Sequence, residues 1–143
     1  MRIHRNVLVR SIAFALVMLL SPAFIAVQVN ASLMQDCQTL ITSLRTATES
    51  AVITGKNAEK DRAGLLNKLD GASTALAAGK LCTAIQKLTD FRNKVNQLIA
   101  SGEINSDPTV GVTGQNLVDD ANEAIACIQA LATQSGITCP VLE

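Results

Sequence analysis

The chain has very few of the side chains on which enzymes usually depend. Its 143 residues include no Trp, no Tyr, three Phe and a single histidine, His4, which lies in a basic leader that we expect to be removed. Without an imidazole, Ser-His-Asp and Cys-His catalysis are excluded, as is haem attachment through C-x-x-C-H. Phe91 is the only aromatic residue after the leader, so glycoside hydrolysis is not expected either. We therefore expect the chain not to be an enzyme.

Charge and metal-binding patterns are also sparse. The chain carries 12 basic and 12 acidic residues, and three of the basic ones lie in the leader, so the mature chain has a formal net charge of −3. No stripe of Lys and Arg is present, and we expect no nucleic acid as a partner. No pair of cysteines has C-x-x-C spacing, and no Asp-x-Asp-x-Asp-Gly loop occurs. We accordingly expect no metal and no cofactor.

Residues 1–31 have the pattern of a secretory signal peptide. A basic start is followed by an apolar stretch over 12–20 and a small-residue site that ends at Ala31. Cleavage between Ala31 and Ser32 leaves a single domain, and the protein is then secreted or periplasmic. The alternative is an uncleaved membrane anchor, because residues 12–29 are almost long enough to span a bilayer, at roughly 18 residues, although Ser21-Pro22 and Gln28 interrupt them.

After the leader, apolar residues recur at steps of three and four, which is typical of amphipathic helices. The expected helices cover about 32–54, 57–78, 80–100 and 114–134. No stretch alternates as a strand would. The average step of 3.5 residues predicts an all-α, antiparallel, up-down-up-down four-helix bundle of residues 32–143, left-handed and preceded by the signal-peptide helix.

Residues that start and stop helices lie between these stretches. Ser32-x-x-Gln35 has the form of a capping box at the new N-terminus, and Thr113 is expected to cap the last helix. Gly79 and Gly136 stand where a helix C-terminus favours a left-handed residue.

Four cysteines remain after the leader, and an exported chain with an even number is expected to form disulfides. The bundle places Cys37, Cys82, Cys127 and Cys139 at one pole, so all three pairings are open. Cys37 and Cys127 lie at similar heights on adjacent helices, which favours Cys37 with Cys127 and Cys82 with Cys139. Cys37 with Cys82 and Cys127 with Cys139 is the next alternative.

The sequence over about residues 57–131 resembles a bacterial helical module, the FIMAH domain, of secreted and surface proteins. The resemblance implies a helical fold and no enzymatic activity, because that module is usually an appendage to other domains. This chain differs in carrying its own leader and four cysteines. The matching positions are core and turn residues, namely Lys68-Leu69-Asp70, Leu76-x-x-Gly79, Ala84-Ile85-Gln86-x-Leu88-x-x-Phe91, Val95-Asn96, Ser101-Gly102-x-Ile104, Ala121-Asn122 and Ile125.

Three polar segments are candidates for chemistry, and each has a simpler structural interpretation. Asp119-Asp120 with Glu123 is the densest acidic cluster, which we interpret as a solvated helix face. The segment 111–114 could offer backbone N–H groups to an anion, but a flexible connection is favoured. The basic residues Lys56, Lys60, Arg62 and Lys68 could dock an acidic partner, although interleaved acids favour simple solvation.

From the sequence we expect an exported, non-catalytic helical module with a structural or protein-interaction role. Its outer helix faces would contact an unidentified protein or cell-surface partner, and a membrane only through an uncleaved leader. Two alternatives remain open. The chain could be a small inhibitor or chaperone of an exported hydrolase, or a carrier of an apolar ligand held between the helices.

Overall fold

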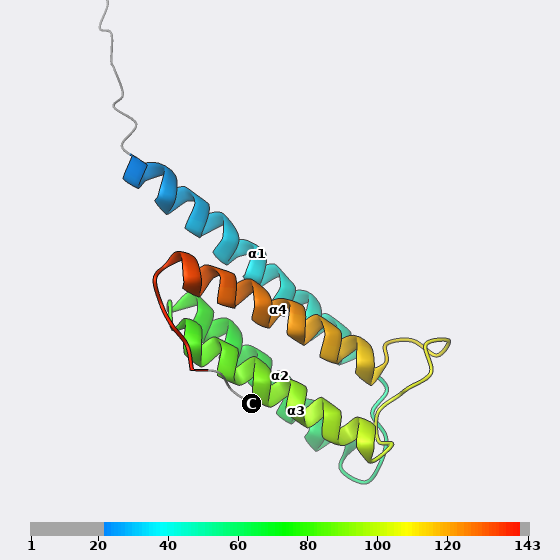
Figure 1. Cartoon of the computed structure of the whole chain (residues 1–143). Helices are drawn as coiled ribbons and strands as arrows, with labels where there is room; N and C mark the ends of the chain where they lie inside the picture. The colour runs from blue at the N-terminus through cyan, green and yellow to red at the C-terminus, as the bar shows by residue number, and fades with distance from the viewer. Residues whose placement is uncertain (1–21, 141–143) are drawn as a thin grey trace, which may run out of the picture.

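The computed structural model describes residues 22–140 (Figure 1). In this part of the chain there are four helices and no strand longer than an isolated bridge, which confirms the all-α class. The rest of the leader, residues 1–21, lies outside the described residues, as do residues 141–143. The helices are α1 (Pro22–Ser50), α2 (Ala58–Ala77), α3 (Leu81–Ala100) and α4 (Gly114–Gln134).

Each helix packs against two others. Helix α1 contacts α2 and α4, and α3 contacts the same two helices. Figure 1 shows consecutive helices side by side with opposite chain directions, and the first turns of α1 extend past the ends of the other three. The four helices therefore surround one interior.

That interior is filled by the apolar stripes seen in the sequence. Phe91, Leu44, Leu69 and Leu117, one from each helix, have no exposed surface. The buried hydroxyl of Thr48 donates to the carbonyl oxygen of Leu44 at 2.8 Å, so this polar group is satisfied within its own helix. The core is thus almost wholly apolar, as the period of three and four residues requires.

Helices α2, α3 and α4 end in the same way. At the end of α2, the N–H of Gly79 donates to Leu76 at 2.9 Å and the N–H of Lys80 to Ala75 at 2.8 Å, with Gly79 at φ +70°. These two hydrogen bonds define a Schellman motif, which needs a left-handed residue and so favours glycine. Gly102 and Gly136 play the same part after α3 and α4. The stop signals expected at Gly79 and Gly136 are confirmed.

Helix α4 starts at the expected cap. The backbone N–H of Asn116 donates to Thr113 Oγ1 at 3.1 Å, and the backbone N–H of Thr113 donates to Asn116 Oδ1 at 3.0 Å. This reciprocal pair is a capping box in which Asn replaces the usual Glu or Gln. The two bonds satisfy N–H groups that the first turn of a helix leaves without partners.

Helix α1 differs from the expected range of 32–54 at both ends. It begins at Pro22, because the chain upstream of Ser32 is itself helical, so the expected capping box at Ser32 does not start the helix here. It ends at Ser50, because the next residues leave the helix to pair with the segment after α3. Signal cleavage after Ala31 stays a prediction.

The pairing that ends α1 joins the two long connections at one pole of the bundle. Ile53 and Ile104 form an isolated antiparallel bridge, with the N–H of Thr54 donating to Glu103 at 2.7 Å. From α2, Arg62 donates to the carbonyl oxygens of Glu49 and Ala51, each at 2.9 Å. We call residues 51–57 and 101–113 the loop pole, and the opposite end, which holds the cysteines, the disulfide pole.

Gly114, at the start of α4, is expected to tolerate no side chain. A Cβ there would lie 2.6 Å from Ile99 Cγ1 and 2.7 Å from Ile104 Cγ2. We expect Gly114→Ala to lower the free energy of unfolding by about 1 to 3 kcal/mol through overpacking. The measurement is chemical denaturation of the disulfide-bonded protein.

Gly64→Ala is the matched control. Gly64 lies within α2 with nothing within 4 Å of a Cβ, so the same change should stabilise the protein by about 0.5 to 1 kcal/mol. Equal effects of the two substitutions would show that Ile99 and Ile104 do not close the start of α4 as described.

Candidate functional site

Both disulfides lie at the disulfide pole. Cys37 of α1 pairs with Cys127 of α4, with a Cα–Cα distance of 5.6 Å, and Cys82 of α3 pairs with Cys139 of the tail at 5.2 Å. This is the pairing that the heights of the residues favoured. Because disulfides persist in oxidising surroundings, the two bridges indicate an extracellular or periplasmic environment.

The second disulfide draws the C-terminal tail back onto the bundle. After Gly136 the tail turns away from α4, and Cys139 is fixed to the first turn of α3 (Figure 1). Between the tail, α3 and α4 lies a half-open pocket of about 460 Å³. The structure therefore has a concave site, and it lies outside the bundle core rather than within it.

The pocket is lined by residues that share one face of α3 and one face of α4. Ile85, Thr89 and Arg92 follow one another at steps of four and three residues on α3, so they share one face of the helix. Ile125 and Gln129 face them from α4, at the same step of four. The pocket therefore has apolar and polar walls, both from rigid helices.

The open side of the pocket is bounded by the tail. Ile137 lines it and keeps 41% of its surface exposed, whereas Ile85 and Ile125 beneath are buried. Thr133 of α4 also lines the pocket, but its hydroxyl donates to the carbonyl oxygen of Gln129 at 2.9 Å. The tail thus contributes an accessible apolar side chain to a site whose floor is formed by helices.

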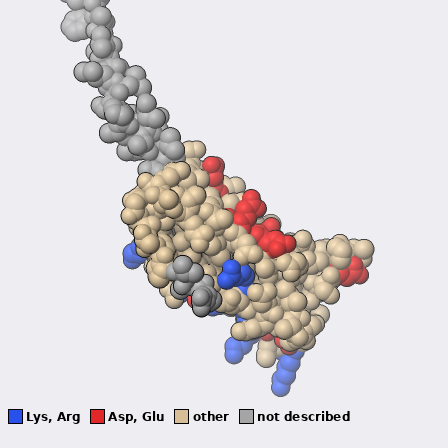
Figure 2. Space-filling view, in the orientation of Figure 1, with Lys and Arg blue, Asp and Glu red and all other residues tan. Residues whose placement is uncertain are grey.

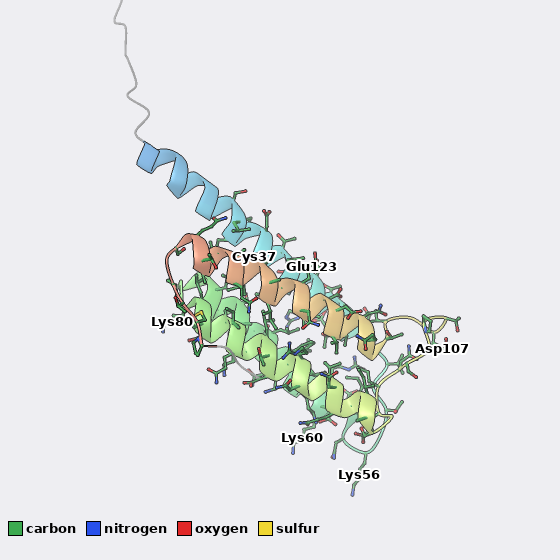
Figure 3. All side chains as sticks on the ribbon, viewed as in Figure 1. Cys37, Lys56, Lys60, Lys80, Asp107 and Glu123 are labelled. Carbon is green, nitrogen blue, oxygen red and sulfur yellow. A yellow bond between two sulfur atoms is a disulfide. The ribbon has the colours of Figure 1, made fainter. Side chains whose placement is uncertain are left out.

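The acidic cluster on α4 lies away from this pocket. Figure 2 shows acidic side chains gathered over α4 and α1, and Glu123 is labelled on this face in Figure 3. Burial, together with the charges of Glu123 and Asp119, raises the pKa of Asp120. Gln115 Nε2 donates to Asp119 Oδ1 at 2.9 Å. In residues 22–140 no three His, Cys, Asp or Glu side chains are grouped to hold a metal ion.

The basic residues considered as a docking patch have different surroundings. Arg62 is used to cap α1. Lys56 and Lys60 point away from the bundle at the loop pole (Figure 3). The neighbouring Asp61 forms a salt bridge with Lys94 of α3 at 2.8 Å, which ties α2 to α3. The arrangement supports a structural role for the charges around Arg62.

The segment that could have offered N–H groups to an anion is instead part of an ordered connection. Asn105 Nδ2 donates to Asp107 O at 2.9 Å and to Val112 O at 3.3 Å, which closes the loop across its base. Asp107 Oδ1 accepts from the backbone N–H of Thr109 at 2.9 Å and from its hydroxyl. The hydrogen bonds from Thr109 lower the pKa of Asp107.

Sequence reasoning did not find the pocket. Thr89 and Arg92 lie on either side of Phe91, which belongs to the apolar stripe of the third helix, and Ile137 follows the last helix. Nothing in the sequence pattern marks them as parts of one site. The signal was present in the pairing of Cys82 with Cys139, because that bond requires the tail to lie across α3.

Comparison of the chain with protein-family models, curated proteins and solved structures finds no match. No helix among the described residues is both long and apolar enough to cross a membrane.

Asp120 gives a prediction about pH. Because its pKa is raised on folding, the ionised carboxylate slightly destabilises the protein at neutral pH, and the penalty disappears as pH falls through the raised pKa to below 3.8. We expect Asp120→Asn to raise the free energy of unfolding at pH 7 by less than about 1 kcal/mol, with a higher unfolding temperature, and to have almost no effect at pH 3. Thermal unfolding at both pH values measures this, with the exposed Asp36→Asn as control. A loss of stability at pH 7 would contradict it.

The disulfide pairing is tested by peptide mapping. Digestion of the non-reduced protein should yield one linked peptide pair that contains Cys37 and Cys127, and another that contains Cys82 and Cys139. Recovery of Cys82 linked to Cys37 would contradict both the pairing and the position of the tail.

Proposed function

We propose that this protein is an exported module that acts without catalysis by binding a protein partner. In this proposal the leader is cleaved after Ala31, and residues 32–143 form a left-handed, up-down-up-down bundle similar to the FIMAH module. The two disulfides support export, because such bonds persist outside the reducing cytoplasm.

The loop pole supplies the surface for that partner. Val110 is 61% exposed and Val52 is 43% exposed, and each belongs to one of the two connections. The N–H of Asn105 donates to the carbonyl oxygen of Val52 at 2.9 Å, so the two connections are joined. Figure 3 shows the connection that holds Asp107 projecting from the end of the bundle. Exposed apolar side chains on a projecting, ordered backbone are typical of contact surfaces.

The main support for the proposal is that the connection 101–113 has a fixed conformation. Its base is closed by the Asn105 side chain and its tip by the turn at Asp107 and Thr109. A loop that is already fixed loses little conformational entropy on binding, so more of the contact energy appears as affinity. The helix faces, by contrast, present mostly polar side chains.

Crosslinking in intact cells tests the proposal. A photoreactive amino acid at Val110 should yield a specific adduct with one protein, because this side chain is at the contact. The same group at Asn93, exposed on α3, is the matched control and should yield no such adduct. Adducts at Asn93 alone would move the contact to the helix faces, and the absence of adducts at both positions would refute a protein partner.

A further inference from the structure

The pocket beneath the tail combines an apolar end with one positive charge. Ile85 and Arg92 are seven residues apart on the same face of α3, so they are about 10 Å apart along the helix. Ile85 and Ile125 are buried, and the more exposed Ile137 of the tail lines the same pocket. The lining described here contains no carboxylate. The site is therefore amphipathic and cationic.

Arg92 has donors that no other residue in the described part of the chain uses. Its Nη1 donates to Asn122 Oδ1 at 3.1 Å, which holds the guanidinium on the α4 side of α3. Arg92 forms no salt bridge with any residue in the described range 22–140. A guanidinium has five N–H donors in a planar fork that matches the two oxygens of a carboxylate. Within the described residues the positive charge is thus positioned but has no carboxylate partner.

We propose that this pocket binds a small amphipathic carboxylate, such as a medium-chain fatty acid. The carboxylate accepts hydrogen bonds from Arg92, and the aliphatic chain lies against Ile85, Ile125 and Ile137. The volume of about 460 Å³ is in the range of small-molecule sites. Each buried methylene adds to affinity through the hydrophobic effect. This activity is separate from partner binding at the loop pole, because the two sites lie at opposite ends of the bundle.

Titration followed by NMR tests the charge and the chain separately. Decanoate, kept below the concentration at which it forms micelles, should cause saturable shifts of the backbone N–H signals of Thr89, Arg92 and Ile137. Decanol should bind at least several times more weakly, because it lacks the charge, and decyltrimethylammonium should not bind. Saturable shifts confined to other surfaces, or equal binding of all three probes, would overturn the proposal.

Two variants of α3 identify the cation. Arg92→Gln should weaken decanoate binding roughly tenfold, because a charged hydrogen bond is lost. Lys87→Gln removes the same charge from an exposed position on the same helix outside the pocket and should leave binding unchanged. Equal affinities of the two variants would refute the role of Arg92.

The wall formed by the tail is tested by the double variant Cys82→Ser with Cys139→Ser. Release of the tail should weaken decanoate binding severalfold, whereas the helical circular dichroism, held by the core and by the Cys37–Cys127 bridge, should persist. Unchanged affinity in a folded double variant would show that the tail is no part of the site and would overturn the pocket as described.

Discussion

Burial of one apolar stripe from each helix is the interaction on which the rest of the structure depends. A single helix of about 20 residues is only marginally stable in water, so each helix persists because its stripe packs against two neighbours. Leu44, Leu69, Leu88 and Leu117 have no exposed surface, and they come from the four different helices. The connections, the tail and the pocket take their positions from this packing. Their geometry is therefore a property of the assembled bundle and not of the local sequence.

The two poles of the bundle are closed by different chemistry. At the disulfide pole, two covalent bridges join residues 90 and 57 positions apart, and on the chain-entropy account each contributes about 4 to 5 kcal/mol by restricting the unfolded chain. At the loop pole, the Ile53–Ile104 bridge, the Arg62 cap and the capping box of Thr113 do so through hydrogen bonds. The loop pole therefore depends on hydrogen bonds and packing, whereas the tail also depends on an oxidising environment.

Periodic features could be predicted from the sequence, and features made by contacts between distant segments could not. Helices α2, α3 and α4 lie within a residue of their expected bounds, because the apolar step and the stop signals at Gly79 and Gly136 act locally. Helix α1 ends four residues before the expected position, because Ile53 pairs with Ile104, 51 positions away. The sequence favours solvation of Arg62 for the same reason, since its acceptors lie in the last turn of α1 and just after it.

The pocket beneath the tail shows the same contrast between periodic features, which the sequence predicts, and contacts between distant segments, which it does not. A stripe at steps of three and four residues predicts burial. Ile85 and Ile125 lie beside the stripes of α3 and α4 and are buried as well, whereas Thr89, Arg92 and Gln129 continue their faces with polar groups. In the core, the positions that face a neighbouring helix are apolar and the helices pack directly against one another. Beneath the tail the equivalent positions are polar, and the tail and the two helices border a half-open pocket of about 460 Å³. If the tail served stability alone, the Cys82–Cys139 bond and apolar contacts with the helices would be enough. Arg92, which has no carboxylate partner among residues 22–140, is better explained by a negatively charged group that completes the site.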